Sequence, residues 1–173
     1  MARESASVEP RASPEGAAVC PLLTPLEEAA WFGMLHAHTV LTKAIDAELV
    51  RVHQLPLMAF EVLMHAARCG AVGLGMSDLA RRVLLSPSGL SRLVDRLEHE
   101  GLLGRQGSDN DGRAVRVCVT PAGRQRLNEA ARTHVAVVRE RFLQGLAEAE
   151  LEQLAALWQR VAGGACDAGP AQG

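Results

Sequence analysis

Aromatic side chains are scarce in this chain of 173 residues: tyrosine is absent, and aromatic residues make up 3% of the sequence. Hydrophobic residues nevertheless amount to 48%, a normal fraction for a globular protein. The core must therefore be built from Leu, Val, Ala and Met, a composition that favours helices over β-sandwiches or barrels. The length allows one domain with a sizeable core and is short for two.

Long apolar segments are also missing. No stretch of about 18 apolar residues is free of charge, so we expect no membrane span. The segment MARESASVEPRASPEGAAVC is small and charged, and it lacks the apolar run of a secretory signal. We interpret residues 1–23 as a disordered leader and residues 163–173 as a disordered tail. Together these features favour a cytoplasmic protein.

Catalytic and metal-binding motifs are lacking as well. The four cysteines (Cys20, Cys69, Cys118 and Cys166) form no C-x-x-C pair, so buried or incidental thiols are favoured over a disulfide framework. The stretch GAVGLG is not followed by Gly-Lys-Ser/Thr, which makes it a linker rather than a phosphate loop. No His-x-x-x-His pair and no Ser/His/Asp set is evident. We predict no enzyme, no metal and no cofactor.

Capping signals and apolar periodicity divide the chain into helices. Thr24-Pro25, Ser86-Pro87 and Thr120-Pro121 each combine a capping side chain with a proline at the first helical position. Ser77 is a further candidate cap, for a short helix. Apolar residues at i, i+3, i+4 and i+7 mark two buried helix faces. These are Phe60, Leu63, Met64 and Ala67 after Pro56, and Leu90, Leu93, Val94 and Leu97 after Pro87.

A hairpin follows the second of these helices. The polar tip GSDNDGR separates LLGRQ from AVRVCVT, and Val115, Val117 and Val119 alternate with other residues as in a strand with one buried face. A long helix from Pro121 to about Gln144 and a last helix complete the order. We predict a mainly α (α+β) fold: a winged helix-turn-helix with a two-stranded wing, flanked by N- and C-terminal dimerisation helices.

The predicted boundaries follow from this order. One domain spans residues 24–162. Its DNA-binding lobe covers about 55–120, and its dimerisation helices cover about 25–50 and 121–162. The flanking helices are too widely apolar to be linkers, which favours a dimer independently of any motif.

Basic charge is concentrated in the predicted lobe. The whole chain has a formal net charge of −2, but residues 76–126 hold nine arginines against six acidic residues. The helix that begins at Pro87 turns small and basic side chains away from its apolar stripe, as entry into a major groove requires. The hairpin adds arginines beside it. The predicted DNA contacts are Ser77, Ser86, Pro87, Ser88, Ser91, Arg92, Arg96, Arg105, Asp111, Arg113 and Arg116.

At these residues the chain resembles the MarR family of bacterial regulators. The matching stretches are LPLMAFEVL, MSDLARRVLLSPSGLSRLVDRLEHEGLLGRQ, DNDGRAVRVCVT and TPAGRQRL; Asp111-Gly112-Arg113 is similar to the family's Asp-x-Arg wing motif. The resemblance spans about Thr24 to Val161. It implies a homodimer on double-stranded DNA, with one recognition helix in each half of a pseudo-palindrome. It also implies a repressor released by a small-molecule effector, often an aromatic acid.

The effector is the least determined part of this prediction. Trp31, Phe32, His36 and His65 lie near the ligand cavity that the resemblance implies, although core or surface roles are commoner for such residues. Two alternatives stay open. A cysteine-based redox switch would keep the fold, although no cysteine stands early in the first helix, where the family's peroxide sensors have theirs. An enzyme or a protein-interaction module would use the winged helix for dimerisation only.

Overall fold

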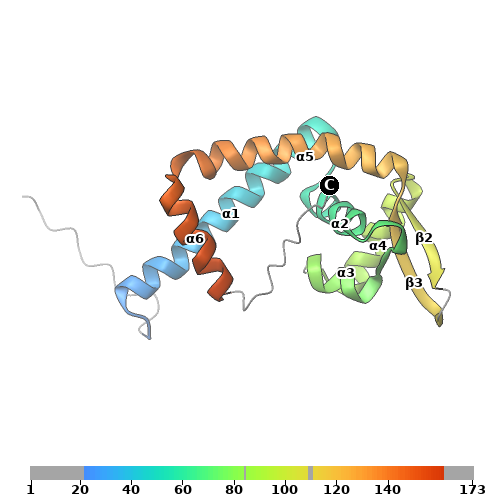
Figure 1. The fold of residues 1–173 in the computed structure, drawn as a ribbon, viewed down its shortest axis with the longest axis horizontal. Helices are drawn as coiled ribbons and strands as arrows, with labels where there is room; N and C mark the ends of the chain where they lie inside the picture. The colour runs from blue at the N-terminus through green and yellow to red at the C-terminus, as the bar shows by residue number, and fades with distance from the viewer. Residues whose placement is uncertain (1–21, 84, 109–110, 162–173) are drawn as a thin grey trace, which may run out of the picture. The chain divides into compact units, whose positions relative to one another are not determined.

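The computed structural model describes residues 22–83, 85–108 and 111–161. The chain divides into two compact units, Met1–His38 and Thr39–Gly173. In the first unit, the described part is residues 22–38, which include the opening of the helix α1 (Pro25–His53). The second unit carries the rest of α1 and every other described helix and strand (Figure 1).

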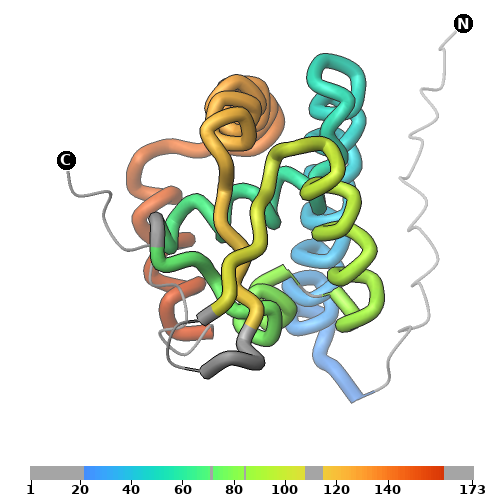
Figure 2. Tube along the Cα trace, turned by 90° about the vertical axis from the view of Figure 1, so that its right-hand side faces the viewer, coloured from blue at the N-terminus to red at the C-terminus, as the bar shows by residue number. Residues whose placement is uncertain are grey.

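The second unit combines helices with a small antiparallel sheet. After α1 come α2 (Leu57–Arg68), the strand β1 (Leu74–Gly75), α3 (Met76–Val83), α4 (Pro87–His99), β2 (Leu103–Ser108), β3 (Asp111–Val119), α5 (Pro121–Arg141) and α6 (Glu148–Val161), with short 3-10 turns at Gly70–Val72 and Leu143–Gly145. Figure 2 shows the chain passing from α4 into β2, back along β3 and up into α5. The predicted winged helix-turn-helix is confirmed.

The sheet has three strands where the sequence predicted two. Its order is β1-β3-β2, and β1 pairs Leu74 with Val117. This strand lies in the GAVGLG segment that the sequence indicated as a linker. Gly73 has a φ of +71°, and a Cβ there would lie 2.6 Å from the Sγ of Cys118. The glycine therefore lets the chain turn closely against β3.

Side-chain caps start three of the helices as predicted. The backbone N–H of Gly89 donates to the Oγ of Ser86 (3.2 Å), and that of Gly123 donates to the Oγ1 of Thr120 (3.0 Å). Thr24 and Glu27 form a reciprocal capping box at the start of α1. The prediction for Ser77 was wrong: α3 already begins at Met76, so Ser77 lies inside its first turn.

The core of the second unit joins the apolar faces of α2, α3, α4 and the sheet. Leu63, Leu79, Leu90, Leu97 and Val117 are among its fully buried members. Both predicted stripes contribute, but Leu93, Met64 and Ala67 are only partly buried at its border. On β3 the valines were expected to be buried on one face. Val117 is buried, but Val115, which lies closer to the tip of the hairpin, is 44% exposed.

Polar contacts fix α2 and α5 to the end of α1. The Oδ1 of Asp46 on α1 accepts from the backbone N–H of Leu57 (2.8 Å), which caps α2 from a neighbouring helix. The Nε2 of His53 lies 2.8 Å from the Oγ1 of Thr133 on α5, and Arg126 donates to the carbonyl oxygen of His53. These contacts hold the lobe on the helices that carry it.

The first turn of α5 passes very close to the loop before β2. A Cβ on Gly123 would lie 2.0 Å from the carbonyl oxygen of Leu102. That oxygen also accepts from the backbone N–H of Thr120 (3.1 Å). Only glycine permits this approach, so the position of the wing relative to α5 depends on it.

We therefore expect Gly123→Ala to lower the free energy of unfolding by about 1–3 kcal/mol, as for other overpacked sites. Urea unfolding followed by circular dichroism measures it. Gly104→Ala is the matched control, since a Cβ on Gly104 meets nothing within 4 Å. Equal stability of the two variants would contradict this account of the contact.

Candidate nucleic-acid interface

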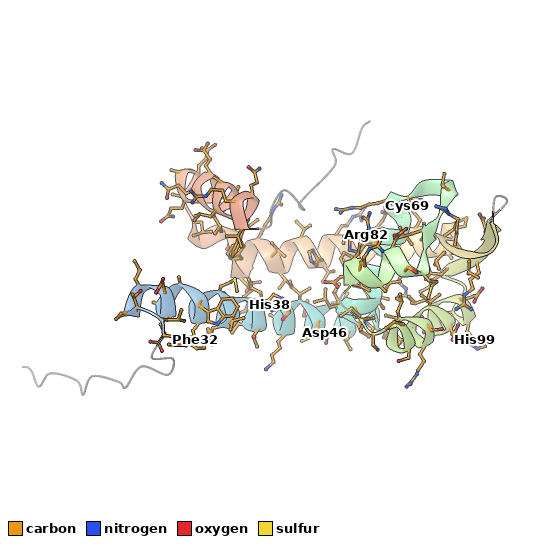
Figure 3. All side chains as sticks on the ribbon, turned by 90° about the horizontal axis from the view of Figure 1, so that it is seen from below. Phe32, His38, Asp46, Cys69, Arg82 and His99 are labelled. Carbon is orange, nitrogen blue, oxygen red and sulfur yellow. The ribbon has the colours of Figure 1, made fainter. Side chains whose placement is uncertain are left out.

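The outward face of α4 is the centre of the candidate interface. Burial of Leu90, Val94 and Leu97 fixes which way the helix faces. Four side chains at i, i+4, i+7 and i+11 then share the opposite side, and all of them are exposed: Ser88, Arg92, Asp95 and His99. This face carries short and basic side chains together with one carboxylate. Figure 3 labels Arg82 beside α3 and His99 at the end of α4.

The N-terminal turn of α4 is open. Ser86, Pro87 and Ser88 are exposed, and a groove of about 350 Å³ separates this turn from α3. The residues lining the groove are Met76, Ser77, Ala80, Arg81, Pro87 and Leu90. Two predicted contacts, Ser77 and Pro87, are thus brought together. Small side chains at a helix N-terminus let a phosphate approach the backbone N–H groups.

The arginines predicted to contact DNA differ in how they are held. Arg92 is exposed, and within the described part of the chain it pairs with no acidic side chain. The Nε of Arg96 lies 3.6 Å from a carboxylate oxygen of Glu100. Arg116 donates from its Nε to the carbonyl oxygen of Val72 (2.9 Å), which ties β3 to the preceding turn.

Arg105 is the most constrained of these arginines. It crosses from β2 to α4 and pairs with Asp95 and with Glu98, the latter at 2.9 Å. Sequence reasoning placed Arg105 at the DNA surface but missed its partners. Asp95 and Glu98 are three residues apart on α4, a spacing that puts two carboxylates side by side and could have signalled a cation between them.

The tip of the wing was predicted to carry Asp111 and Arg113. The backbone of both residues belongs to β3, but their side chains lie outside the described part of the structure. Ser91, the remaining predicted contact, is half-buried on α4. All of these assignments stay predictions.

The residues predicted for a ligand pocket fall in both units. Trp31, Phe32 and His36 are exposed on the first part of α1, in the first unit. His65 is half-buried on α2, in the second unit. Its Nδ1 is buried and has no hydrogen-bond partner among the described residues. Burial, then the positive charges of Arg82 and Arg68, lower the pKa of His65.

Among the described residues, thiols and candidate metal ligands form no further site. Cys118 is buried and Cys69 half-buried, whereas Cys20 and Cys166 lie outside the described residues. In residues 22–83, 85–108 and 111–161, no group of three or more His, Cys, Asp or Glu side chains could hold a metal ion. No helix in these ranges is both long and apolar enough to cross a membrane.

Comparisons with known proteins agree with this geometry. A model described as MarR family matches residues 53–114. The regulator PecS of Dickeya dadantii (strain 3937), described as an HTH-type transcriptional regulator, is 31% identical over 121 residues, which cover 68% of this chain and 72% of PecS. This chain belongs to the MarR family.

Solved MarR-family structures share the fold. Sco3205 from Streptomyces coelicolor, a MarR family transcriptional regulator solved in complex with DNA, is 28% identical with a TM-score of 0.75, covering 84% of this chain and 95% of Sco3205. CouR from Rhodococcus jostii RHA1, solved bound to p-coumaroyl-CoA, is 26% identical with a TM-score of 0.68, covering 77% of this chain and 91% of CouR. This MarR-family protein is accordingly a DNA-binding transcriptional regulator.

Two histidines of the MarR-family protein make its stability depend on pH. His134 on α5 stacks on Phe60 of α2 with ring centroids 4.9 Å apart, and burial lowers its pKa, as it does that of His65. Both rings take up protons less readily when folded. The unfolded chain therefore binds more protons as the pH falls through 6.5, the ordinary value, and stability is lost in that direction.

We expect the free energy of unfolding to fall between about pH 7.5 and about pH 5.5. The double variant His65→Leu/His134→Phe should flatten this slope, because it removes both titrating rings and keeps an aromatic ring beside Phe60. The measurement is chemical unfolding at a series of pH values, with the exposed His36→Gln as the control. An unchanged slope in the double variant would show that other groups cause the loss.

Proposed function

We propose that this protein is a homodimeric, sequence-specific repressor that binds an inverted repeat in double-stranded DNA and is released from it by a small molecule. The observation that carries the proposal is the outward face of α4, exposed between the open N-terminal turn and the wing. A helix presented in this way fits the major groove, and the wing then reaches the neighbouring groove. Sco3205, solved with DNA, supports this use of the fold.

Apolar surface on two helices supports the homodimer. In the first unit, α1 exposes Leu26, Trp31 and Phe32; in the second, α6 exposes Leu157, Trp158 and Val161, and none of its residues is buried. Large apolar side chains in such numbers are costly in water and mark a surface that a partner covers. A second copy of the chain is the occupant we propose, because two-fold symmetry matches an inverted repeat.

The effector we propose is a small organic acid, with an aromatic acid as the first candidate. CouR, solved bound to p-coumaroyl-CoA, supports the binding of a small organic molecule by a protein of this fold. Trp31, Phe32, His36 and His65 remain the residues we assign to its recognition. We propose no catalytic activity and place the protein with the DNA in the cytoplasm.

DNA binding is tested by selecting duplexes from a random pool with the wild-type protein. The selected sequences should contain an inverted repeat, and Arg92→Gln should lower the affinity for them by about tenfold and relax base preference near the recognition helix. Arg132→Gln removes the same charge from the exposed side of α5 and serves as the control. Loss of affinity to the same degree in both variants would refute the proposed surface.

Dimerisation is tested on α6. Leu157→Glu/Trp158→Glu places charge on the apolar face, so the double variant should sediment as a monomer and bind the inverted repeat weakly. Glu152→Lys changes the charge by two units at an exposed position on the other side of the same helix and should stay dimeric. Sedimentation velocity measures the mass, and a dimeric double variant would exclude α6 from the interface.

A further inference from the structure

The recognition helix carries negative charge on the face that would enter DNA. Asp95 lies on the outward side with Ser88, Arg92 and His99, and its side chain is 56% exposed. Glu98 follows three residues later, on the flank of α4 that faces β2. Two carboxylates at this place oppose the approach of phosphates, which carry one negative charge for about every 1.7 Å of duplex.

Arg105 forms ion pairs with both carboxylates. One of its terminal nitrogens pairs with Asp95 and the other with Glu98 at 2.9 Å. The Arg105 side chain is about one-third exposed, and its guanidinium offers its donors in a fixed planar fork that suits two acceptors. A side chain held in this way has little freedom left to reach a phosphate.

We propose that Arg105 supports DNA binding by offsetting one of the two negative charges that Asp95 and Glu98 bring to the recognition helix, and that it is not itself a phosphate contact. It is thus a positioning residue that sets the charge of the outward face of α4. The inference rests on the proposed DNA surface and changes the role that the sequence suggested for this arginine. The wing thus lowers the net charge of these two acids from −2 to −1, which weakens their repulsion of phosphates.

Affinity measurements in two backgrounds test the proposal. The probe is a fluorescein-labelled duplex of about 30 base pairs with the selected inverted repeat, and anisotropy at fixed ionic strength gives Kd. Arg105→Gln is made in the native chain and again in Asp95→Asn/Glu98→Gln. We expect a loss of about tenfold in the native chain and at most about twofold where the carboxylates are already neutral.

The ratio of the two losses of affinity, in the native chain and in Asp95→Asn/Glu98→Gln, distinguishes an indirect role of Arg105 from a direct contact. A ratio above about threefold supports charge neutralisation, because independent sites give nearly equal losses; a smaller ratio makes Arg105 a direct contact and overturns the proposal. Asp95→Asn/Glu98→Gln alone should bind at least as tightly as the native chain. Weaker binding with altered base preference would mean that a carboxylate reads cytosine, which also overturns it.

Two control variants distinguish failure of this proposal from misfolding of the variant and from failure of the proposed function. Arg105→Lys keeps the positive charge but loses the planar fork, so it should bind DNA more tightly than Arg105→Gln does, whereas a purely steric role of the guanidinium predicts equal losses in the two variants. Arg132→Gln should bind as the native chain does. If the native chain binds no duplex, the proposed function fails and this inference with it. If it binds and Arg92→Gln weakens binding, a low ratio overturns this inference alone.

Discussion

Burial of one apolar stripe on α4 is the constraint on which the rest of the interface depends. Leu90, Val94 and Leu97 are fully or almost fully withdrawn from water, and rotating the helix would expose them at a cost of about 1.5–3 kcal/mol each. The stripe therefore fixes the outward face without any contact from DNA. Everything else in the interface is placed relative to this helix: the capped N-terminal turn, the wing, and the ion pairs between them.

Packing determines which side chains α4 exposes, and electrostatics determines how much of their charge is available to DNA. The chain as a whole is slightly acidic, with a net charge of −2, so overall attraction to DNA cannot orient it. Local charge must do so, and its effect depends on which side chains are already paired. Arg105 and Arg116 are engaged within the protein, to carboxylates and to a backbone carbonyl, whereas Arg92 is exposed. A count of arginines therefore overstates the charge available to phosphate.

Local signals made most of the fold predictable. A capping side chain followed by proline locates the starts of α1, α4 and α5 because the interaction lies within four residues. The third strand was not predicted, because β1 is defined by its pairing with β3 more than forty residues away. A glycine-rich segment such as GAVGLG also indicates a linker when only local sequence is considered. The cap of α2 was not predicted either, because the capping residue Asp46 lies on another helix and not next to α2 in the sequence.

Residue types in the interface were easier to predict than their state of pairing. Sequence periodicity tells which side chains leave the core on the same face, and it placed Ser88 and Arg92 there. Pairing across elements depends instead on the register between α4 and β2, which no local pattern encodes. Asp95 and Glu98 meet Arg105 only because the chain turns back at Gly101, whose positive φ brings β2 alongside the helix. An arginine predicted to contact DNA is thus held within the protein, where it offsets one of the two negative charges that Asp95 and Glu98 bring to α4.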